Sequence, residues 1–152
     1  MGITIERPRP EEAPELTRVI LSSKSYWGYT DEWLERCKNV LGVSPAMIRS
    51  KDFFVGRSEG DIVFIYSLRR KGKGMYELDD CWVAPGYIGR GYGRMMFEHM
   101  VGTLRSVGGI TLEILSDPNA EGFYRRMGAV RVGERPSRVD GRPLPVLEYR
   151  VK

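Results

Sequence analysis

The chain has 152 residues, a length that suits one domain with a core of ordinary size. Its 24 Lys and Arg against 20 Asp and Glu leave a net charge of +4, too small and too scattered an excess to predict nucleic-acid binding. No apolar run approaches the roughly 18 residues of a membrane span, and the amino terminus is rich in proline and charge. Two cysteines, Cys37 and Cys81, form no disulfide framework, so we expect a reducing, cytoplasmic compartment. From the charge and the apolar runs we expect neither a nucleic-acid nor a membrane partner.

Hydrophobic periodicity and turn residues divide the chain into short strands and helices. Period-two alternation and strand-forming residues predict seven strands, which cover residues 3–7, 53–57, 62–69, 75–83, 110–115, 129–134 and 144–150. Amphipathic spacing and N-cap residues predict helices over residues 11–23, 31–41, 92–107 and 119–127, with a shorter one over 45–50. Three successive strands followed by a strand-helix-strand unit indicate a mixed sheet, antiparallel first and parallel later.

Four local expectations follow from this division of the chain. The helix over 92–107 is expected to bury a stripe formed by Phe97, Met100, Leu104 and Val107. His99 lies off this stripe, and we expect it at the surface without a catalytic role. The two lysines of the turn over residues 71–74 are expected to be solvated, and residues 136–145 are expected to form a loop between the last two strands.

Acidic residues concentrate on the predicted strand over residues 75–83. With a period of two, Glu77 and Asp79 share one face of this strand, and Asp80 lies on the other. Three carboxylates within four residues are unusual in a central strand, because a buried charge is costly without a partner. The pattern therefore indicates either a functional cavity or a sheet edge.

A glycine-rich turn follows this strand after a Pro-Gly break. Its glycines are Gly89, Gly91 and Gly93, and an amphipathic helix begins at once. Backbone without side chains can approach a bulky anion closely, and a helix start supplies unpaired N–H groups. Arg90 and Arg94 add positive charge, so the turn predicts a phosphate or diphosphate site. The alternative is a strand-to-helix turn that binds nothing.

Two familiar phosphate-binding patterns do not fit the turn. The Walker pattern requires Lys and then Ser or Thr after its last glycine, whereas Arg94 and Met95 follow here. The dinucleotide fingerprint requires GxGxxG early in a strand-helix-strand unit, whereas residues 89–93 have another spacing and lie in mid-chain.

Two segments resemble one family. Residues 88–93, IGRGYG, resemble the Gln/Arg-x-x-Gly-x-Gly/Ala coenzyme-A loop of the GNAT superfamily of N-acetyltransferases, with Ile88 where the family usually has Gln or Arg. Residues 117–129, DPNAEGFYRRMGA, resemble the family segment in which an Asn and a Tyr on a short helix lie beside the coenzyme. The motifs occur in the family's order and spacing, and the resemblance covers nearly the whole chain.

The resemblance implies the fold and the activity. The fold would be one domain over residues 1–152, of the α+β class, with a central mixed and mostly antiparallel twisted sheet of about seven strands flanked by about four helices. The activity would be transfer of an acetyl group from acetyl-CoA to a primary amine by direct attack in a ternary complex, without a metal. The implied coenzyme contacts are Trp82, Val83, Ile88, Gly89, Arg90, Gly91, Tyr92, Gly93, Arg94, Asn119, Phe123 and Tyr124.

Two residues are implied for the proton transfers. Glu77 falls where GNAT enzymes with a glutamate base carry it, and Tyr124 matches the tyrosine that lies near the sulfur and can protonate the leaving thiolate. Several alternatives stay open. Asp79 or Asp80 could be the base or could bind a cationic acceptor, the carboxylates could pair with arginines, and Tyr124 could serve only in packing. Cys81 could carry the acyl group, although its mid-strand position without a neighbouring His argues against this.

The acceptor side is implied only in outline. In the resembling fold the segment with Tyr26, Trp27 and Tyr29 overhangs the acceptor, so these rings would form an aromatic wall, unless they only cover the sheet. The rings together with Asp79 and Asp80 favour a cationic amine on a small molecule or a peptide. The competing functions are a non-catalytic acyl-CoA sensor, a structural domain, and transfer of another acyl group. Dimers are common in the superfamily, so a homodimer is among the assemblies that we expect.

Overall fold

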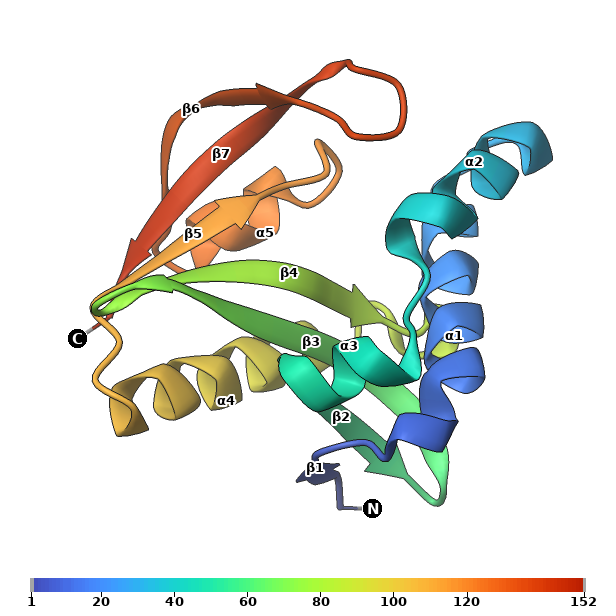
Figure 1. The fold of residues 1–152 in the computed structure, drawn as a ribbon, viewed down its shortest axis with the longest axis horizontal. Helices are drawn as coiled ribbons and strands as arrows, with labels where there is room; N and C mark the ends of the chain where they lie inside the picture. The colour runs from blue at the N-terminus through green and yellow to red at the C-terminus, as the bar shows by residue number, and fades with distance from the viewer. Residues whose placement is uncertain (1, 152) are drawn as a thin grey trace. The chain divides into compact units, whose positions relative to one another are not determined.

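Residues 2–151 are the part of the chain that this computed structural model describes, and they contain seven β-strands and five α-helices (Figure 1). The strands form one sheet in the order β1-β2-β3-β4-β5-β7-β6. Strands β4 and β5 are parallel, whereas β1–β2, β5–β7 and β6–β7 are antiparallel pairs. The predicted α+β class and the mixed, mostly antiparallel sheet are therefore confirmed.

The elements have the following bounds. The strands are β1 (Thr4–Glu6), β2 (Asp52–Ser58), β3 (Asp61–Gly72), β4 (Met75–Val83), β5 (Thr111–Leu115), β6 (Val130–Pro136) and β7 (Pro143–Arg150). The helices are α1 (Ala13–Ser25), α2 (Asp31–Leu41), α3 (Pro45–Ser50), α4 (Tyr92–Ser106) and α5 (Glu121–Arg126), with two short 3-10 helices, η1 (Pro10–Glu12) and η2 (Pro85–Tyr87). No helix within residues 2–151 combines the length and the apolar character that crossing a bilayer requires.

The chain forms two compact units. The first unit comprises residues 1–67 and 80–96, and the second comprises residues 68–79 and 97–152. The second unit holds 13 of the 24 Lys and Arg but only 9 of the 20 Asp and Glu, so it accounts for the whole net charge of +4. The first unit is therefore neutral overall.

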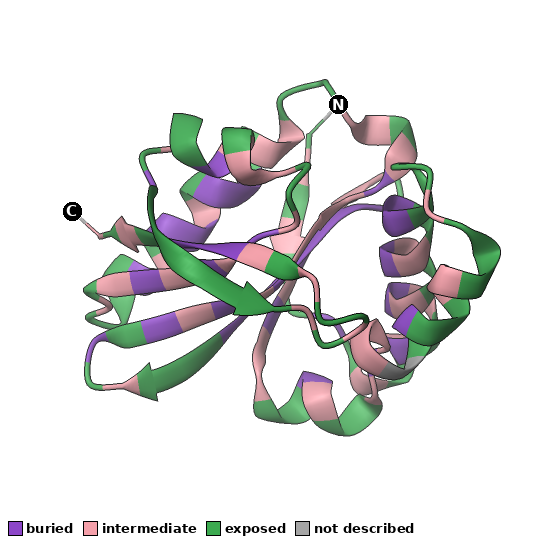
Figure 2. Cartoon of the chain, turned by 90° about the horizontal axis from the view of Figure 1, so that it is seen from above, coloured by how far each residue is buried: buried purple, intermediate pink, exposed green. Residues whose placement is uncertain are grey.

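The core of the first unit forms where α1 meets α3 and the strands. Leu16 and Ile20 lie four residues apart on one face of α1 and are fully buried. They belong to an apolar cluster that includes Ile48 of α3 and Phe53 and Val55 of β2. Figure 2 shows in purple that buried positions recur along both the strands and the helices. Burial of several such side chains stabilises the unit by about 1.5–3 kcal/mol each.

Polar contacts set the helix starts of the first unit. The hydroxyls of Thr30 and Ser44, residues that the sequence predicts as the N-caps of the helices over 31–41 and 45–50, accept hydrogen bonds from the third residues of α2 and α3, so both N-caps are confirmed. At η1, the Glu12 carboxylate accepts the Arg9 backbone N–H at 2.8 Å and pairs with the Arg57 guanidinium of β2. Burial alone would raise the pKa of Glu12, but the Arg9 N–H and Arg57 together outweigh it and lower that pKa.

The core of the second unit comes from α4, β5 and β7. Met100, Leu104, Leu112, Ile114 and Leu147 are all almost completely buried. Residues Ile114 and Leu147 also face each other across the antiparallel pair of β5 and β7.

The helix α4 and the loop between β6 and β7 differ from the sequence-based expectations. The prediction for Val107 was wrong, because α4 ends at Ser106 and Val107 is 56% exposed. Gly108, with a φ of +75°, turns the chain away there, and Val101 is buried in the helix instead. The expected loop over residues 136–145 is shorter, since β6 extends to Pro136, β7 begins at Pro143, and the Ser137 N–H bonds the Arg142 carbonyl at 2.8 Å.

Candidate active site

A turn with two left-handed glycines leads from η2 into α4 in the first unit. Gly89 has a φ of +81° and Gly91 a φ of +86°, a conformation that side chains with a Cβ rarely adopt. A Cβ built at either position would meet no atom within 4 Å. The backbone of this turn, which we call the glycine loop (residues 88–93), is therefore open to a ligand, and its glycines are required by their φ angles.

The charges around the glycine loop favour an anion. The α-helix α4 begins at Tyr92, so its first N–H groups lack intrahelical partners and carry the positive end of the helix dipole. Arg90 and Arg94 are exposed, and neither has an ion-pair partner among the described residues. The Arg90 guanidinium lies 5.7 Å from the ring centre of Tyr87, which positions it over η2. Two uncommitted cations therefore flank a helix start and bare backbone.

The end of β4 lies in the same unit as the glycine loop. The Val83 carbonyl accepts a hydrogen bond from the Ser23 hydroxyl at 2.8 Å, so this end of β4 is fastened to α1. The indole Nε1 of Trp82 is buried and has no hydrogen-bond partner among the described residues. Asp80, on the face of β4 opposite Glu77 and Asp79, is buried and accepts a hydrogen bond from the Ser67 hydroxyl at 2.6 Å. Because Asp80 is buried and hydrogen-bonded to Ser67, this contact supports a structural role. Its predicted contact with the acceptor stays a prediction.

The predicted aromatic wall follows α1 in the first unit. Tyr26 and Trp27 are 53% and 46% exposed and pack edge to face with ring centres 5.0 Å apart. Tyr29 instead stacks on Trp33 of α2 at 4.1 Å. Two rings thus face solvent and two pack on each other, and the structure leaves open both interpretations of this segment.

A buried lysine that the sequence analysis missed lies against these rings. Lys24 of α1 is only 6% exposed, and its Nζ lies 4.8 Å from the ring centre of Tyr29, 5.1 Å from that of Trp33 and 5.6 Å from that of Trp82. Cation–π contacts of this kind are worth about 0.5–2 kcal/mol each, more when desolvated. The available signal was a lysine on the helix that runs directly into four aromatic residues.

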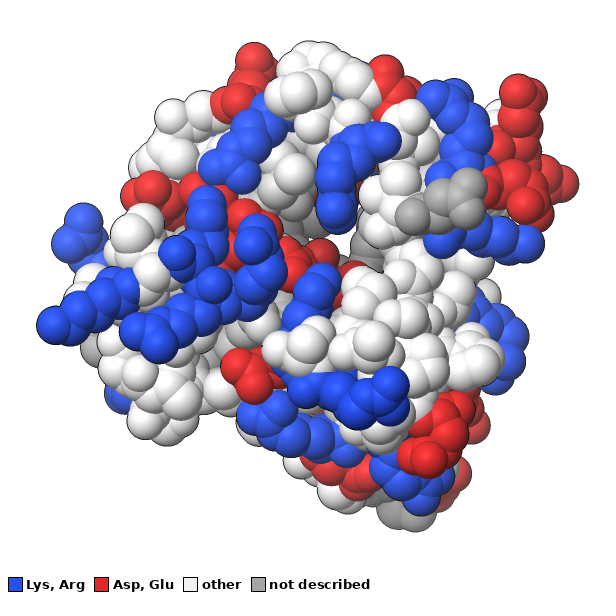
Figure 3. Space-filling model, viewed as in Figure 1, with Lys and Arg blue, Asp and Glu red and all other residues white. Residues whose placement is uncertain are grey.

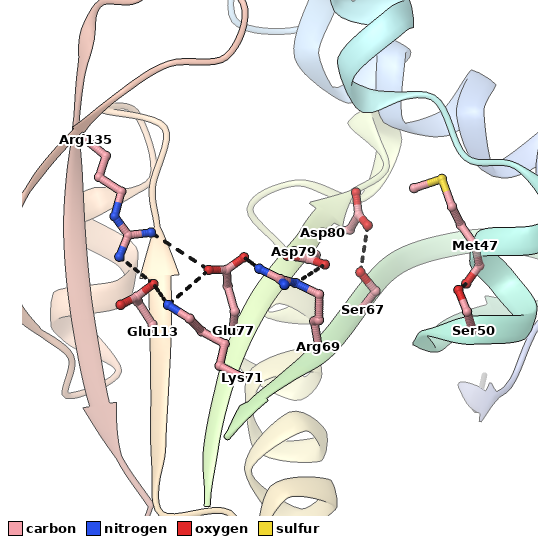
Figure 4. A network of polar contacts seen from close by, with 10 residues as sticks. All are labelled: Met47, Ser50, Ser67, Arg69, Lys71, Glu77, Asp79, Asp80, Glu113 and Arg135. Carbon is pink, nitrogen blue, oxygen red and sulfur yellow. Dashed lines mark hydrogen bonds and ion pairs between the residues drawn. The ribbon is translucent and has the colours of Figure 1, made fainter. Parts of the chain in front are cut away.

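Acidic and basic side chains interleave on one face of the second unit. Glu77 of β4 and Glu113 of β5 are direct partners in the parallel register, and like charges placed opposite each other destabilise a sheet unless they are countered. Two cations counter them: the Lys71 Nζ lies 2.8 Å from Glu113 and 3.7 Å from Glu77, and the Arg135 guanidinium lies 2.7 Å and 3.9 Å from the same carboxylates (Figure 4).

Arg69 completes this arrangement, which we call the charge cluster (Arg69, Lys71, Glu77, Asp79, Glu113 and Arg135). Its guanidinium donates a hydrogen bond to Glu77 Oε1 at 2.7 Å and lies 3.5 Å from Asp79 (Figure 4). The hydrogen bond to Glu77 and the charges of both carboxylates raise the pKa of Arg69. The expectation that Lys71 is simply solvated was wrong, because it bridges two strands' carboxylates.

The second resembling segment lies in the second unit. The Asn119 backbone N–H bonds the Asp117 carboxylate at 2.9 Å, and α5 begins two residues later, so Asn119 precedes the helix rather than starting it. Tyr124 is buried, and its ring lies 5.4 Å from that of Phe123. Phe97 packs edge to face on Phe123 at 6.3 Å. Tyr124 therefore belongs to a packed aromatic group, and the alternative of a packing role stays open.

His99 differs from its expected place at the surface. It is half-buried on α4, and burial lowers the pKa of its imidazole from the ordinary value of 6.5.

The site residues form two groups, one in each unit. The glycine loop, the end of β4 and the aromatic segment belong to the first unit, and Glu77, Asp79 and the α5 residues belong to the second.

Comparison with known proteins identifies the family. A model described as the acetyltransferase (GNAT) family matches residues 16–129, well over half of the chain. The chain belongs to the GNAT acetyltransferase family. The matched range contains the glycine loop and the segment over residues 117–129, so it includes both motifs on which the resemblance was stated.

Solved structures share the fold of this GNAT chain at low sequence identity. PaiA N-acetyltransferase from Thermoplasma acidophilum, in complex with coenzyme A, is 14% identical with a TM-score of 0.80, and 99% of each chain is covered. Ribosomal-protein-S18-alanine N-acetyltransferase from Escherichia coli is 15% identical with a TM-score of 0.74, over 99% of this chain and 95% of that one. N-acetylglutamate synthase from Neisseria gonorrhoeae, complexed with coenzyme A and N-acetyl-glutamate, is 18% identical with a TM-score of 0.69, over 100% of this chain and 36% of that one. No curated protein matches the sequence significantly.

Within residues 2–151, no three His, Cys, Asp or Glu side chains are grouped so that they could hold a metal ion. The carboxylates of the charge cluster face lysine and arginine instead.

Proposed function

We propose that this protein transfers an acetyl group from acetyl-CoA to a primary amine by direct attack in a ternary complex. The observation that carries the proposal is the glycine loop, where left-handed Gly89 and Gly91 bare the backbone before α4 and Arg90 and Arg94 stand without ion-pair partners among the described residues. Membership of the GNAT acetyltransferase family supports the reaction class. Coenzyme A bound to structural neighbours supports the donor.

The donor would bind through the first unit. The diphosphate of acetyl-CoA would accept hydrogen bonds from backbone N–H groups of the glycine loop and the first turn of α4, with Arg90 and Arg94 adding charge. The amides of the pantetheine arm would pair with backbone near Trp82 and Val83. The unpartnered indole N–H of Trp82 is a further donor at this end of β4.

The chemistry requires a base and an acid. The amine nitrogen attacks the thioester carbon, the carbon–sulfur bond breaks, a base takes the proton of the amine, and the departing thiolate takes a proton from an acid. We assign the base to Glu77 and the acid to the Tyr124 phenol. Glu77 holds Arg69 at 2.7 Å and has Lys71 and Arg135 within 4 Å, so one of these contacts has to loosen before its carboxylate accepts a proton.

The test is release of free thiol from acetyl-CoA over a panel of primary amines, together with two variants. We expect Glu77→Gln to lower the rate and to remove the acidic limb of its pH profile, and Tyr124→Phe to lower kcat with little change in coenzyme affinity. Full rate with an unchanged profile would eliminate Glu77 as the base. Equal weakening of turnover and coenzyme binding in Tyr124→Phe would assign that ring to packing.

A second candidate is a non-catalytic acyl-CoA sensor on the same fold. The observation that favours it is the ion pairing of Glu77, since a carboxylate held by three cations is poorly placed to act as a base. A sensor binds acetyl-CoA in calorimetry but releases no thiol with any amine. An enzyme does both, and a chain that binds no coenzyme at all contradicts both proposals. A longer acyl group is tested by repeating the titration with longer acyl-CoA donors.

A further inference from the structure

The charge cluster has an inner acidic layer and an outer basic layer. Side chains of Glu77, Asp79 and Glu113 are only 15–16% exposed. The cationic side chains above them are more accessible, at 51% for Arg69, 44% for Arg135 and 31% for Lys71. A molecule that approaches this face of the second unit therefore meets guanidinium and ammonium groups before it reaches a carboxylate.

The outer layer keeps hydrogen-bonding capacity. A guanidinium carries several N–H donors in a planar fork that matches a carboxylate. Arg69 donates a hydrogen bond to Glu77 through one terminal nitrogen, Nη2, and its Nε lies 3.5 Å from Asp79. Arg135 approaches Glu113 through one terminal nitrogen, Nη2, at 2.7 Å. Both side chains are about half exposed, so part of each remains accessible to a ligand. Lys and Arg side chains gather on this face of the molecule, with acidic groups between them (Figure 3).

The ion pairs also change the expected acceptor. The sequence favoured a cationic amine because of the aromatic rings together with Asp79 and Asp80. Asp80 is buried and accepts a hydrogen bond from the Ser67 hydroxyl. In the charge cluster, Glu77, Asp79 and Glu113 each already have a cation within 4 Å, so an additional cation gains little there and is repelled by the outer layer. The net charge of +4 in the second unit acts in the same direction.

We propose that the charge cluster recognises the carboxylate of an amine acceptor, with Arg69 and Arg135 as its specificity-determining residues. The acceptor is then an amine that also carries at least one carboxylate: a free acidic amino acid, or a peptide with acidic residues beside its amino terminus. This inference rests on the proposed acetyl transfer, because it names the substrate class of the same reaction. It adds that the acceptor is held by its negative charge.

Pairs of amines that differ only in one group provide the test. Free aspartate is compared with asparagine, glutamate with glutamine, and a peptide Ala-Asp-Asp with Ala-Asn-Asn, with kcat/KM measured by thiol release from acetyl-CoA. We expect the carboxylate member of the preferred pair to be favoured about tenfold or more, the size of one charge-assisted hydrogen bond. The first two pairs report a free amino acid and the third a peptide, so the preferred pair distinguishes the two sources.

Variants locate the effect. Arg69→Gln and Arg135→Gln should each lower the ratio of kcat/KM for the carboxylate member to kcat/KM for the amide member about tenfold, mainly through the KM of the carboxylate member. Both residues also contact Glu77, and a change in its reactivity affects both members alike and leaves this ratio as it is. The matched control is Arg70→Gln, since Arg70 is the neighbouring residue on β3, lies outside the cluster and donates a hydrogen bond to the Gly72 carbonyl. Arg70→Gln should leave the preference as it is.

Two results would overturn the inference: equal use of carboxylate and amide by the unaltered protein, or an equal loss for both members in the Arg69 and Arg135 variants. A binding experiment keeps the inference testable if no amine is acetylated. The N-acetylated forms of all three pairs, the two amino-acid pairs and the peptide pair, are titrated by calorimetry into the protein with coenzyme A. Tighter binding of the carboxylate member of any pair, lost in Arg135→Gln, supports carboxylate recognition even when thiol release fails, whereas equal or absent binding of both members in all three pairs contradicts it.

Discussion

Replacement of Gly91 by alanine should weaken coenzyme binding far more than it weakens the fold. The φ of Gly91 is +86°, where a residue with a Cβ costs about 1–2 kcal/mol. Its Cβ would meet no atom within 4 Å, so no steric term is added in the free protein. We therefore expect the free energy of unfolding to fall by about 1 kcal/mol, which lowers Tm by roughly 2–4 °C for a chain of this length.

The loss of affinity has a different origin. The added methyl group fills the open space in front of the backbone where a diphosphate would lie, and it separates the anion from one or two N–H donors. Each charge-assisted hydrogen bond lost costs about 1.5–3 kcal/mol, so Kd for acetyl-CoA should rise by about 10-fold to 100-fold or more. Isothermal titration calorimetry measures Kd, and a thermal melt of the same sample measures Tm.

Two further variants separate strain from obstruction. Asn tolerates the left-handed region, so Gly91→Asn should recover much of the lost stability while its side chain still obstructs the ligand. Gly86→Ala is the matched control, because Gly86 precedes the loop with open space at its Cβ and without a left-handed φ. It should leave Kd and Tm nearly unchanged. If Gly91→Ala and Gly91→Asn both bind acetyl-CoA as the unaltered protein does, the glycine loop is not a diphosphate site.

Three further predictions concern stability. Leu104→Ala should cost about 2–5 kcal/mol in urea unfolding because Leu104 is fully buried, whereas Val107→Ala should change stability by less than about 0.5 kcal/mol; similar losses would contradict the assigned end of the core. The pKa of Glu12 is lowered from 4.5, so the stabilisation by its carboxylate is present above that pH and disappears as the pH falls. Glu12→Gln should therefore lower the free energy of unfolding by about 1–2 kcal/mol near neutral pH and by almost nothing in acid. A loss of stability that is independent of pH would refute the ion pair. The pKa of His99 is lowered from 6.5 by burial, so the unfolded chain takes up this proton first and stability declines as the pH falls below 6.5; His99→Gln should flatten that decline in melts over a pH series, and an unchanged slope would contradict burial as its cause.

Local chemistry explains which parts of the site could be predicted. Gly89 and Gly91 were predictable because only glycine readily adopts the left-handed backbone that turns the chain into α4. The N-caps at Thr30 and Ser44 were also predictable from local chemistry, because each hydroxyl bonds the backbone N–H three residues later, within one helical turn.

Contacts between distant segments could not be predicted in this way. Glu113 lies 42 residues from Lys71 in the sequence, and their ion pair depends on which strands become neighbours and in which register. Lys24 carries an ordinary basic side chain, and its burial is decided by Trp82 of β4 as much as by the rings that follow it. The acidic residues alone therefore left open a functional cavity, a sheet edge or pairing with arginines. The periodicity could locate the strands that carry the paired cations but could not show which strands become neighbours.

The parallel register that sets Glu77 opposite Glu113 constrains how this protein can diverge. A relative that loses Lys71 or Arg135 alone is left with mutual repulsion across two strands, so a tolerated exchange should be accompanied by a neutral residue at one of the two glutamates. Correlated substitution at these four positions is therefore expected in an alignment of homologous sequences, and a double-mutant cycle on Lys71 and Glu113 should show strong non-additivity. Substitutions at these positions would therefore accumulate in pairs, because a substitution of one cation alone destabilises the sheet and is selected against.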